Sequence, residues 1–177
     1  MDQAIFNSQF RKQTPVGDTH PRDVCKDCGF IHYENPKIVT GILPIWDGKI
    51  LLCKRAINPR KNYWTFPCGY LENGETVEEG ALREADEEAG ITVDIQQLLS
   101  VYSVPHVHQV HIFFLGNMTS SSVIIGPETL DTKFVDLNDI NKDELAFSSV
   151  QFSINAYKQF INGKGSLPQL GAYQAPS

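Results

Sequence analysis

Three glutamates near the middle of the chain are the residues best suited to chemistry. Glu84, Glu87 and Glu88 are spaced i, i+3 and i+4, so their carboxylates converge if the segment is helical. Like charges at this spacing cost about 0.2–0.5 kcal/mol per pair, and they oppose the dipole at a helix C-terminus. Hard cations such as Mg²⁺ or Mn²⁺ take oxygen ligands, so a metal site explains a cluster that stability alone does not.

A short helix must position these glutamates. Asn73-Gly74 indicates a turn, Thr76 and Glu79 fit a capping box that starts a helix, and Gly90 fits its C-terminal cap. At 100° per residue, one arc of this helix carries Ala81, Leu82, Ala85 and Ala89. Because most of these residues are small, we expect the helix to lie close against a sheet.

The remaining chain supplies strands on both sides of that helix and a second helix after them. Strands are predicted at residues 37–45, 49–56, 98–104, 110–118, 122–126 and 133–137, and a helix at 148–161. Asp47-Gly48 indicates a hairpin between the first two strands. The pattern predicts an α+β fold, an α/β/α sandwich with a mixed β-sheet flanked by helices.

We expect one main domain at residues 36–162, preceded by a short polar segment at 1–35. A tail at 163–177, rich in Gly, Pro, Ser and Gln, is expected to be flexible. A chain of 177 residues is long enough for one well-buried domain.

Composition narrows the range of partners and compartments. A net charge of −6 argues against nucleic acid or an anionic membrane as a partner. The sequence contains no apolar run of about 18 residues and no signal-peptide pattern. Its four cysteines are not needed to staple a domain of this size, so a reducing cytoplasm is the expected location.

The stretch from residue 69 to 91 resembles the Nudix box, Gly-x5-Glu-x7-Arg-Glu-U-x-Glu-Glu-x-Gly-U, in which U is a bulky aliphatic residue. The matching positions are Gly69, Glu75, Arg83, Glu84, Glu87, Glu88, Gly90 and Ile91; Ala85 is a small occupant of an aliphatic position. The resemblance implies a Nudix fold, with the three glutamates as ligands of Mg²⁺ or Mn²⁺. It also implies that the backbone carbonyl near Gly69 joins them.

The same resemblance implies supporting roles around the box. Arg83 is expected to pair with Glu75 or Glu79, and Glu75 to orient the loop. Family members often add an acid from a later loop as ligand or general base, and the candidates are Glu128 and Asp131. Each is equally well explained as a solvated loop residue.

The implied reaction is hydrolysis of a diphosphate, in which metals neutralise the phosphate oxygens and activate a water molecule. Further motifs resemble the branch containing FAD and ADP-ribose pyrophosphatases and zinc-ribbon relatives. They are Cys25-x-x-Cys28, His32–Lys37, Leu51–Ile57, Trp64–Pro67, Pro105-His106 and Leu145–Phe147. We therefore expect FAD or ADP-ribose as a small-molecule substrate. The family commonly pairs, so a homodimer is expected as well.

The N-terminal segment departs from its zinc-ribbon relatives. They carry two Cys-x-x-Cys knuckles around one Zn²⁺, whereas this chain keeps only Cys25 and Cys28, with Asn7 and Phe10 where the first pair would stand. We do not expect zinc unless His20 or a partner chain completes the site.

Substrate-binding residues are less well defined by the sequence. Arg55 can contact a phosphate or simply extend from a strand end. Trp64, Tyr70 and Phe134 can stack on a purine or flavin, or pack in the core. Two alternative functions remain: a pyrophosphatase that removes damaged nucleoside triphosphates, and a Nudix-like sensor that binds without cleaving. Sensors usually lose box glutamates, and this chain keeps them.

Overall fold

The computed structural model describes residues 9–175, and the contacts divide the chain into two units that meet between Pro36 and Lys37. The first unit is a small antiparallel sheet in the order β1-β2-β3. Its strands are β1 (Phe10–Gln13), β2 (Arg22–Cys25) and β3 (Ile31–His32).

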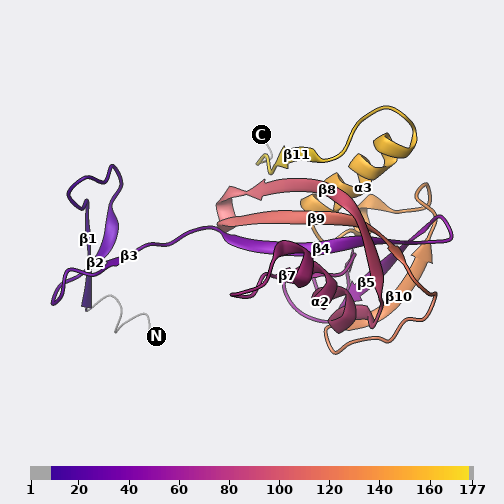
Figure 1. The fold of residues 1–177 in the computed structure, drawn as a ribbon, viewed down its shortest axis with the longest axis horizontal. Helices are drawn as coiled ribbons and strands as arrows, with labels where there is room; N and C mark the ends of the chain where they lie inside the picture. The colour runs from indigo at the N-terminus through magenta and orange to yellow at the C-terminus, as the bar shows by residue number, and fades with distance from the viewer. Residues whose placement is uncertain (1–8, 176–177) are drawn as a thin grey trace. The chain divides into compact units, whose positions relative to one another are not determined.

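The second unit is built on a mixed sheet in the order β10-β5-β4-β9-β8-β11, with β6 added to β5 and β7 added to β4. Its strands are β4 (Lys37–Trp46), β5 (Lys49–Arg55), β6 (Trp64–Thr65), β7 (Cys68–Tyr70), β8 (Val93–Val104), β9 (Gln109–Met118), β10 (Thr129–Val135) and β11 (Gln169–Ala172). Its helices are α2 (Val77–Ala89) and α3 (Ser148–Ile161), with 3-10 turns η1 (Pro105–Val107) and η2 (Lys142–Glu144). In Figure 1, β4, β9 and β8 run side by side at the centre of this unit.

The sheet is mixed because β4 pairs in parallel with β9 and β11 in parallel with β8, while its other pairs are antiparallel. The predicted hairpin between β4 and β5 is confirmed. Asp47 and Gly48 have φ angles of 48° and 75°, as a two-residue turn of this hand requires.

The core consists of two apolar layers, one on each face of the sheet. Neighbouring residues of one strand, such as Ile42 and Leu43, belong to different clusters because successive side chains point to opposite faces. One layer includes Ala81, Ala85 and Ala89 of α2. The other includes Val150, Ile154 and Ala156 of α3. A mixed sheet with a helix on each face confirms the predicted fold class.

Four sequence expectations are corrected. Leu82 is 38% exposed, so only the alanines of its predicted arc pack on the sheet. Residues 122–126 are not a strand, and the strand predicted at 133–137 runs from Thr129 to Val135. The tail expected to be flexible contains β11, whose Gly171 packs so closely under Phe152 and Tyr102 that a side chain there would overlap both.

Within residues 9–175, no helix is both long enough and apolar enough to span a membrane.

Candidate functional site

Helix α2 begins and ends as the sequence predicts. Thr76 Oγ1 accepts a hydrogen bond from the Glu79 N–H at 3.2 Å, and Glu79 Oε2 accepts one from the Thr76 N–H at 2.8 Å. These two bonds complete the capping box. Gly90 ends the helix in the left-handed conformation, with φ 56°. The helix ends therefore fix which face of the glutamate segment meets the sheet.

Glu84 and Glu88 lie on the buried side of α2, with 9% and 7% of each residue exposed. The Glu84 carboxylate lies directly against Gly69, where any side chain would overlap it. Glu88 Oε2 accepts a hydrogen bond from the Cys68 N–H at 3.2 Å. Both carboxylates thus pack against the backbone of β7.

Burial raises the pKa of both carboxyl groups. The pKa of Glu88 is raised to about 8, chiefly by burial and also by the charges of Glu84 and Glu128, while the Cys68 N–H and Arg55 partly oppose the rise. For Glu84 the pKa is also raised by burial, partly offset by Arg83. The surroundings of Glu84 and Glu88 therefore disfavour the charged forms of both carboxyl groups, a cost that a bound cation would relieve.

Arg83 ties the box together. Its Nε and Nη2 donate to the two carboxylate oxygens of Glu75 at 2.7 and 3.1 Å, which confirms one of its two expected partners. Its Nη1 donates to Glu84 Oε1 at 2.7 Å and to Glu87 Oε2 at 3.0 Å. Glu79, the other expected partner, serves the helix cap instead.

Glu87 does not share the burial of the other two glutamates. Its side chain is 59% exposed and is held by Arg83 at the edge of the box. Among residues 9–175, no three acidic, Cys or His side chains are already arranged around one point suitable for a metal ion. Glu84 and Glu88 therefore share the buried side of α2, whereas Glu87 lies at its exposed edge.

Glu128 and Arg55 flank the buried pair. The charge of Glu128 contributes to raising the pKa of both Glu84 and Glu88, and the charge of Arg55 lowers that of Glu88. Arg55 Nε donates to the Pro59 carbonyl at 3.0 Å, and its guanidinium lies 5.0 Å from the centre of the Phe147 ring. Glu128, from a loop, and Arg55, from the end of β5, thus both lie near Glu84 and Glu88.

Asp131 is placed elsewhere. It pairs with Lys54 across β10 and β5, and Lys54 lies over Trp64 on the face of the sheet that α3 covers. Its carboxylate accepts a hydrogen bond from the Thr132 N–H at 2.8 Å. Of the two candidate acids, the structure brings only Glu128 to the box.

The three predicted aromatic residues have different surroundings. Trp64 packs on the α3 side, with Lys133 and Lys54 at 4.0 and 5.7 Å from its ring centre. Phe134 packs against the cluster beneath α2. Tyr70 alone keeps a half-exposed ring, 48% exposed, and it adjoins Gly69.

The loop at residues 122–126, for which a strand was predicted, leads into Glu128 and is fixed to α2. The Ile124 N–H donates to the Ala89 carbonyl at 2.8 Å and the Gly126 N–H to the Glu88 carbonyl at 3.1 Å. A side chain at Gly126 would overlap the Glu87 carbonyl. The run of apolar residues resembled a strand, while Gly126-Pro127 was the available signal for a close backbone approach.

A second set of contacts missed by the sequence analysis anchors Tyr70. Gln109 Nε2 donates to the Tyr70 hydroxyl at 2.9 Å, and Gln109 Oε1 lies 3.0 Å from His111 Nε2. His111 Nδ1 lies 2.8 Å from Ser149 Oγ of α3. No local motif joins residues so far apart in sequence, so only the folded sheet reveals this chain of contacts.

In the N-terminal unit, Cys25 and Cys28 occupy a tight turn between β2 and β3. The Gly29 N–H donates to the Cys25 carbonyl at 3.1 Å. The N–H groups of Cys28 and Asp27, together with the Cys28 thiol, lower the pKa of the Cys25 thiol. Phe10 pairs with Cys25 across β1 and β2, whereas Asn7 lies outside the described residues.

Comparison with known proteins gives two family matches. Residues 35–155 match the NUDIX domain, and residues 8–34 match the family described as Nudix N-terminal, a zinc ribbon. The N-terminal match supports a ribbon-like segment before the main domain.

Three individual relatives are informative. An ADP-ribose pyrophosphatase from Methanocaldococcus jannaschii is 36% identical over 135 residues, or 74% of this chain and 78% of that protein. The crystal structure of a NUDIX hydrolase from Nitrosomonas europaea is 38% identical, covers 93% of both chains and has a TM-score of 0.87. A putative 8-oxo-dGTP diphosphatase from Bacillus subtilis is 34% identical over 88 residues, or 49% of this chain and 57% of that protein.

The complete box, its placement on a capped helix against the sheet, and the match over most of the chain agree with one another. The chain belongs to the NUDIX domain family and is a Nudix hydrolase.

Proposed function

We propose that this Nudix hydrolase is a divalent-cation-dependent pyrophosphohydrolase that cleaves ADP-ribose to AMP and ribose 5-phosphate. The observation that carries the proposal is the buried pair of Glu84 and Glu88 packed against β7, with Glu128 and Arg55 beside them. The M. jannaschii relative is an ADP-ribose pyrophosphatase, and it supports this substrate ahead of FAD.

The donor set fits Mg²⁺ or Mn²⁺. Carboxylates and a backbone carbonyl are hard oxygen ligands. Among the described residues, Arg83 donates to Glu84 and the charge of Arg55 lowers the pKa of Glu88. Glu84, Glu88 and the carbonyl of Gly69 would hold the metal, joined by Glu87 after it leaves Arg83. Bound there, such a cation neutralises diphosphate oxygens and lowers the pKa of a water molecule.

The remaining residues have roles that follow from their positions. Arg55 binds the phosphate, because a guanidinium can donate two parallel hydrogen bonds to two oxygens of one phosphate group. Glu128 accepts the proton of the attacking water, since it lies beside the glutamates without being part of α2. Arg83 and Glu75 orient the loop before α2, and the exposed ring of Tyr70 is the surface on which the adenine stacks.

The test is product analysis by mass spectrometry. ADP-ribose, FAD, NADH, coenzyme A and nucleoside triphosphates are incubated separately with Mg²⁺, Mn²⁺ or EDTA. We expect AMP and ribose 5-phosphate from ADP-ribose at the highest kcat/KM, with no turnover in EDTA. Tight binding of ADP-ribose without AMP release in Mg²⁺ would contradict the proposal and indicate a sensor.

A triphosphate-cleaving enzyme is the second candidate, because the B. subtilis relative is a putative 8-oxo-dGTP diphosphatase. It predicts release of inorganic pyrophosphate from a nucleoside triphosphate at a higher kcat/KM than any ADP-ribose turnover. The same substrate panel separates the two candidates.

We further propose that one chain does not close a zinc site, because Cys25 and Cys28 are the only cysteines of the N-terminal segment at residues 1–35. Metal analysis of the purified protein should give far less than one zinc per chain. A ratio near one zinc per two chains would instead indicate a site completed by a partner. Light scattering on the same sample tests the homodimer expected from the family.

A further inference from the structure

A pocket of about 270 Å³ opens on the α3 face of the larger unit, between α3, η2 and the loop after β10. Its apolar lining is Leu137, Ile140, Leu145 and Ile154. Leu145 and Ile154 belong to the core cluster under α3, whereas Glu84 and Glu88 are part of α2 on the other face of the sheet. The pocket is therefore separate from the candidate active site.

The polar lining of this pocket carries positive charge. It consists of Asn138, Lys142, Gln151, Asn155 and Lys158. None of the described acidic residues lines the pocket, although the chain has a net charge of −6. The acids nearest to Lys142 in sequence are Asp143 and Glu144, and Glu144 is engaged by Lys133 and Asn141.

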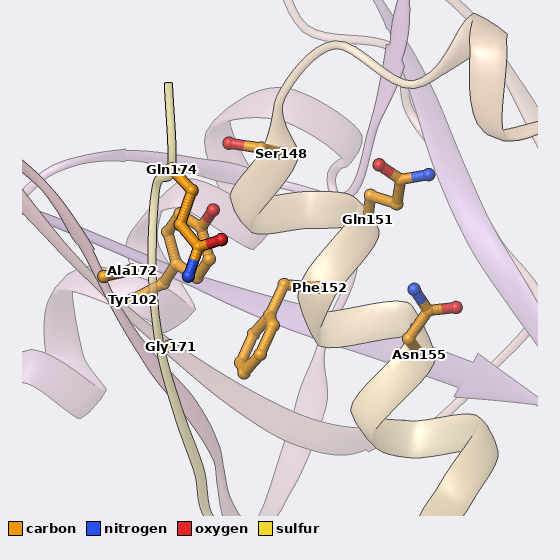
Figure 2. Close-up of a pocket in the computed structure, with 8 residues that line it drawn as sticks. All are labelled: Tyr102, Ser148, Gln151, Phe152, Asn155, Gly171, Ala172 and Gln174. Atoms are coloured by element: carbon orange, nitrogen blue, oxygen red, sulfur yellow. The ribbon is translucent and has the colours of Figure 1, made fainter. Parts of the chain in front are cut away.

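These polar side chains have no hydrogen-bond or ion-pair partner among the residues that the structure describes. Across residues 9–175, neither lysine makes an ion pair, and the three amide side chains make no hydrogen bond. The amide groups of Gln151 and Asn155 project from α3 on the side away from β11 (Figure 2). Two cations and three amides thus surround an apolar floor with their hydrogen-bonding capacity unused.

Gln151 and Asn155 also line a neighbouring groove between α3 and β11. That groove contains the aromatic rings of Tyr102 and Phe152, whose centres are 5.1 Å apart. Figure 2 shows Phe152 directed toward β11, on the opposite side of α3 from Gln151 and Asn155.

We propose that the pocket beside α3 binds a phosphate monoester no larger than a nucleoside monophosphate, at a site distinct from the catalytic glutamates. A phosphate monoester carries a charge of about −1.5 to −2 at pH 7, which matches two ammonium groups better than one carboxylate does. The amides suit the hydroxyl and ring-nitrogen groups of a sugar or base, and the apolar floor suits a ring face. The assignment does not depend on which diphosphate the enzyme cleaves.

The test uses ¹⁵N-labelled full-length protein in EDTA, so that no metal-dependent turnover occurs. Ribose 5-phosphate, AMP, inorganic phosphate and succinate are titrated separately, and backbone amide shifts are followed by NMR. We expect saturable shifts clustered at residues 137–145 and 151–158 for ribose 5-phosphate or AMP. Which of the two binds more tightly tells whether a sugar or a nucleoside is preferred.

Charge-matched variants locate the binding. Lys142→Gln and Lys158→Gln should each raise the Kd roughly tenfold, because each removes a charge-assisted contact. Lys164→Gln makes the same change in net charge outside the pocket and should leave the Kd within about twofold. Since none of these side chains has a partner among the described residues, the variants should unfold at the wild-type temperature.

Three results would overturn the proposal: shifts confined to residues 69–90, an unchanged Kd in both pocket variants, or succinate binding as tightly as the phosphate esters. The first would assign the ligand to the catalytic box. The second would show that the lysines are merely solvated. The third would show a general anion pocket with no preference for phosphate.

Discussion

Burial is what separates Glu84 and Glu88 from the other acids of α2. Glu78 and Glu79 lie in the first turn, where negative charge suits the helix dipole and stays in water. Glu84 and Glu88 lie near the opposite end and pack against β7, where charge is costly to hold. A residue kept at such a cost is expected to serve the reaction.

Replacing Glu88 with Gln should lower kcat/KM for the preferred substrate by at least about 100-fold, because the amide keeps the shape and loses the charge that would hold the proposed cation. Steady-state kinetics in Mg²⁺ measures the loss. Glu78→Gln is the matched control, since it makes the same charge change on the exposed side of the same helix. Wild-type activity in Glu88→Gln would refute the assignment of this carboxylate to the site.

His111 gives the protein a predicted dependence of stability on pH. Burial lowers the pKa of its imidazole to about 4 from an ordinary value of 6.5. Gln109 Oε1 can only accept, so the neutral ring donates from Nε2 and accepts at Nδ1 from the Ser149 hydroxyl. A proton added at Nδ1 would force the Ser149 hydroxyl to accept instead of donate and would leave a charge on a buried ring.

The sign follows from proton uptake on unfolding. Between about pH 4 and 6.5 the unfolded chain binds this proton more readily than the folded one, so the free energy of unfolding falls as pH is lowered through that range. The full effect is about 3 kcal/mol, from 1.36 kcal/mol per pKa unit. Urea unfolding at pH 7.5, 5.5 and 4.5 measures it.

A variant isolates the contribution of this histidine. His111→Gln should be less stable at pH 7.5 but should lose less stability toward pH 4.5 than the wild type. His108→Asn, at an exposed position with φ 55° that Asn tolerates, should keep the wild-type pH slope. Equal slopes for all three proteins would show that His111 is not buried as a neutral group.

At the scale of elements, α2 depends on the loop that follows β9. The last carbonyls of a helix need donors, and the N–H groups of Ile124 and Gly126 supply them. The same loop continues through Pro127 to Glu128. The same loop therefore caps α2 and positions the candidate base Glu128.

Gly126→Ala should disturb both functions of this loop, because the added methyl group overlaps the Glu87 carbonyl. We expect the free energy of unfolding to fall by about 1–3 kcal/mol and kcat to fall about tenfold or more as Glu128 shifts. Thermal unfolding and kinetics give the two values. Gly165→Ala, whose nearest neighbour is the end of the Gln169 side chain, should change neither.

At the scale of the whole chain, the C-terminal segment completes the sheet of the larger unit. Strand β11 pairs with β8, and the Tyr173 N–H donates to the Ser103 carbonyl at 2.8 Å. The centres of the Tyr173 and His106 rings are 4.3 Å apart. Figure 1 shows β11 lying along β8. Without it, β8 would be an exposed edge strand.

A chain ending at Lys164 should therefore unfold at a lower urea concentration than the full chain. We expect its free energy of unfolding to be lower by about 1–3 kcal/mol. Its amides at residues 100–103 should exchange faster with deuterium, which mass spectrometry detects. Leu170→Ser, at a side chain that is 78% exposed, should leave both measurements unchanged. Unaltered exchange in the shortened chain would show that β11 contributes nothing to the edge.

The sequence by itself determined the parts of the protein that depend on local rules. Capping at Thr76 and Gly90, the Asp47-Gly48 turn and the helix at α3 each follow from residues adjacent in the chain, and all are confirmed. The fixed spacing of the box residues identified the family for the same reason. Local backbone preferences and side-chain periodicity need no knowledge of distant contacts.

Only the tertiary structure decided which acids gather. Glu128 and Asp131 are three residues apart and equally acidic in sequence, yet the cap of α2 and the pairing of β10 send them to opposite faces. The apolar run at 122–126 became a helix cap, and the polar tail became a strand, because distant partners offered hydrogen bonds there. Such contacts depend on strand order, which periodicity does not encode.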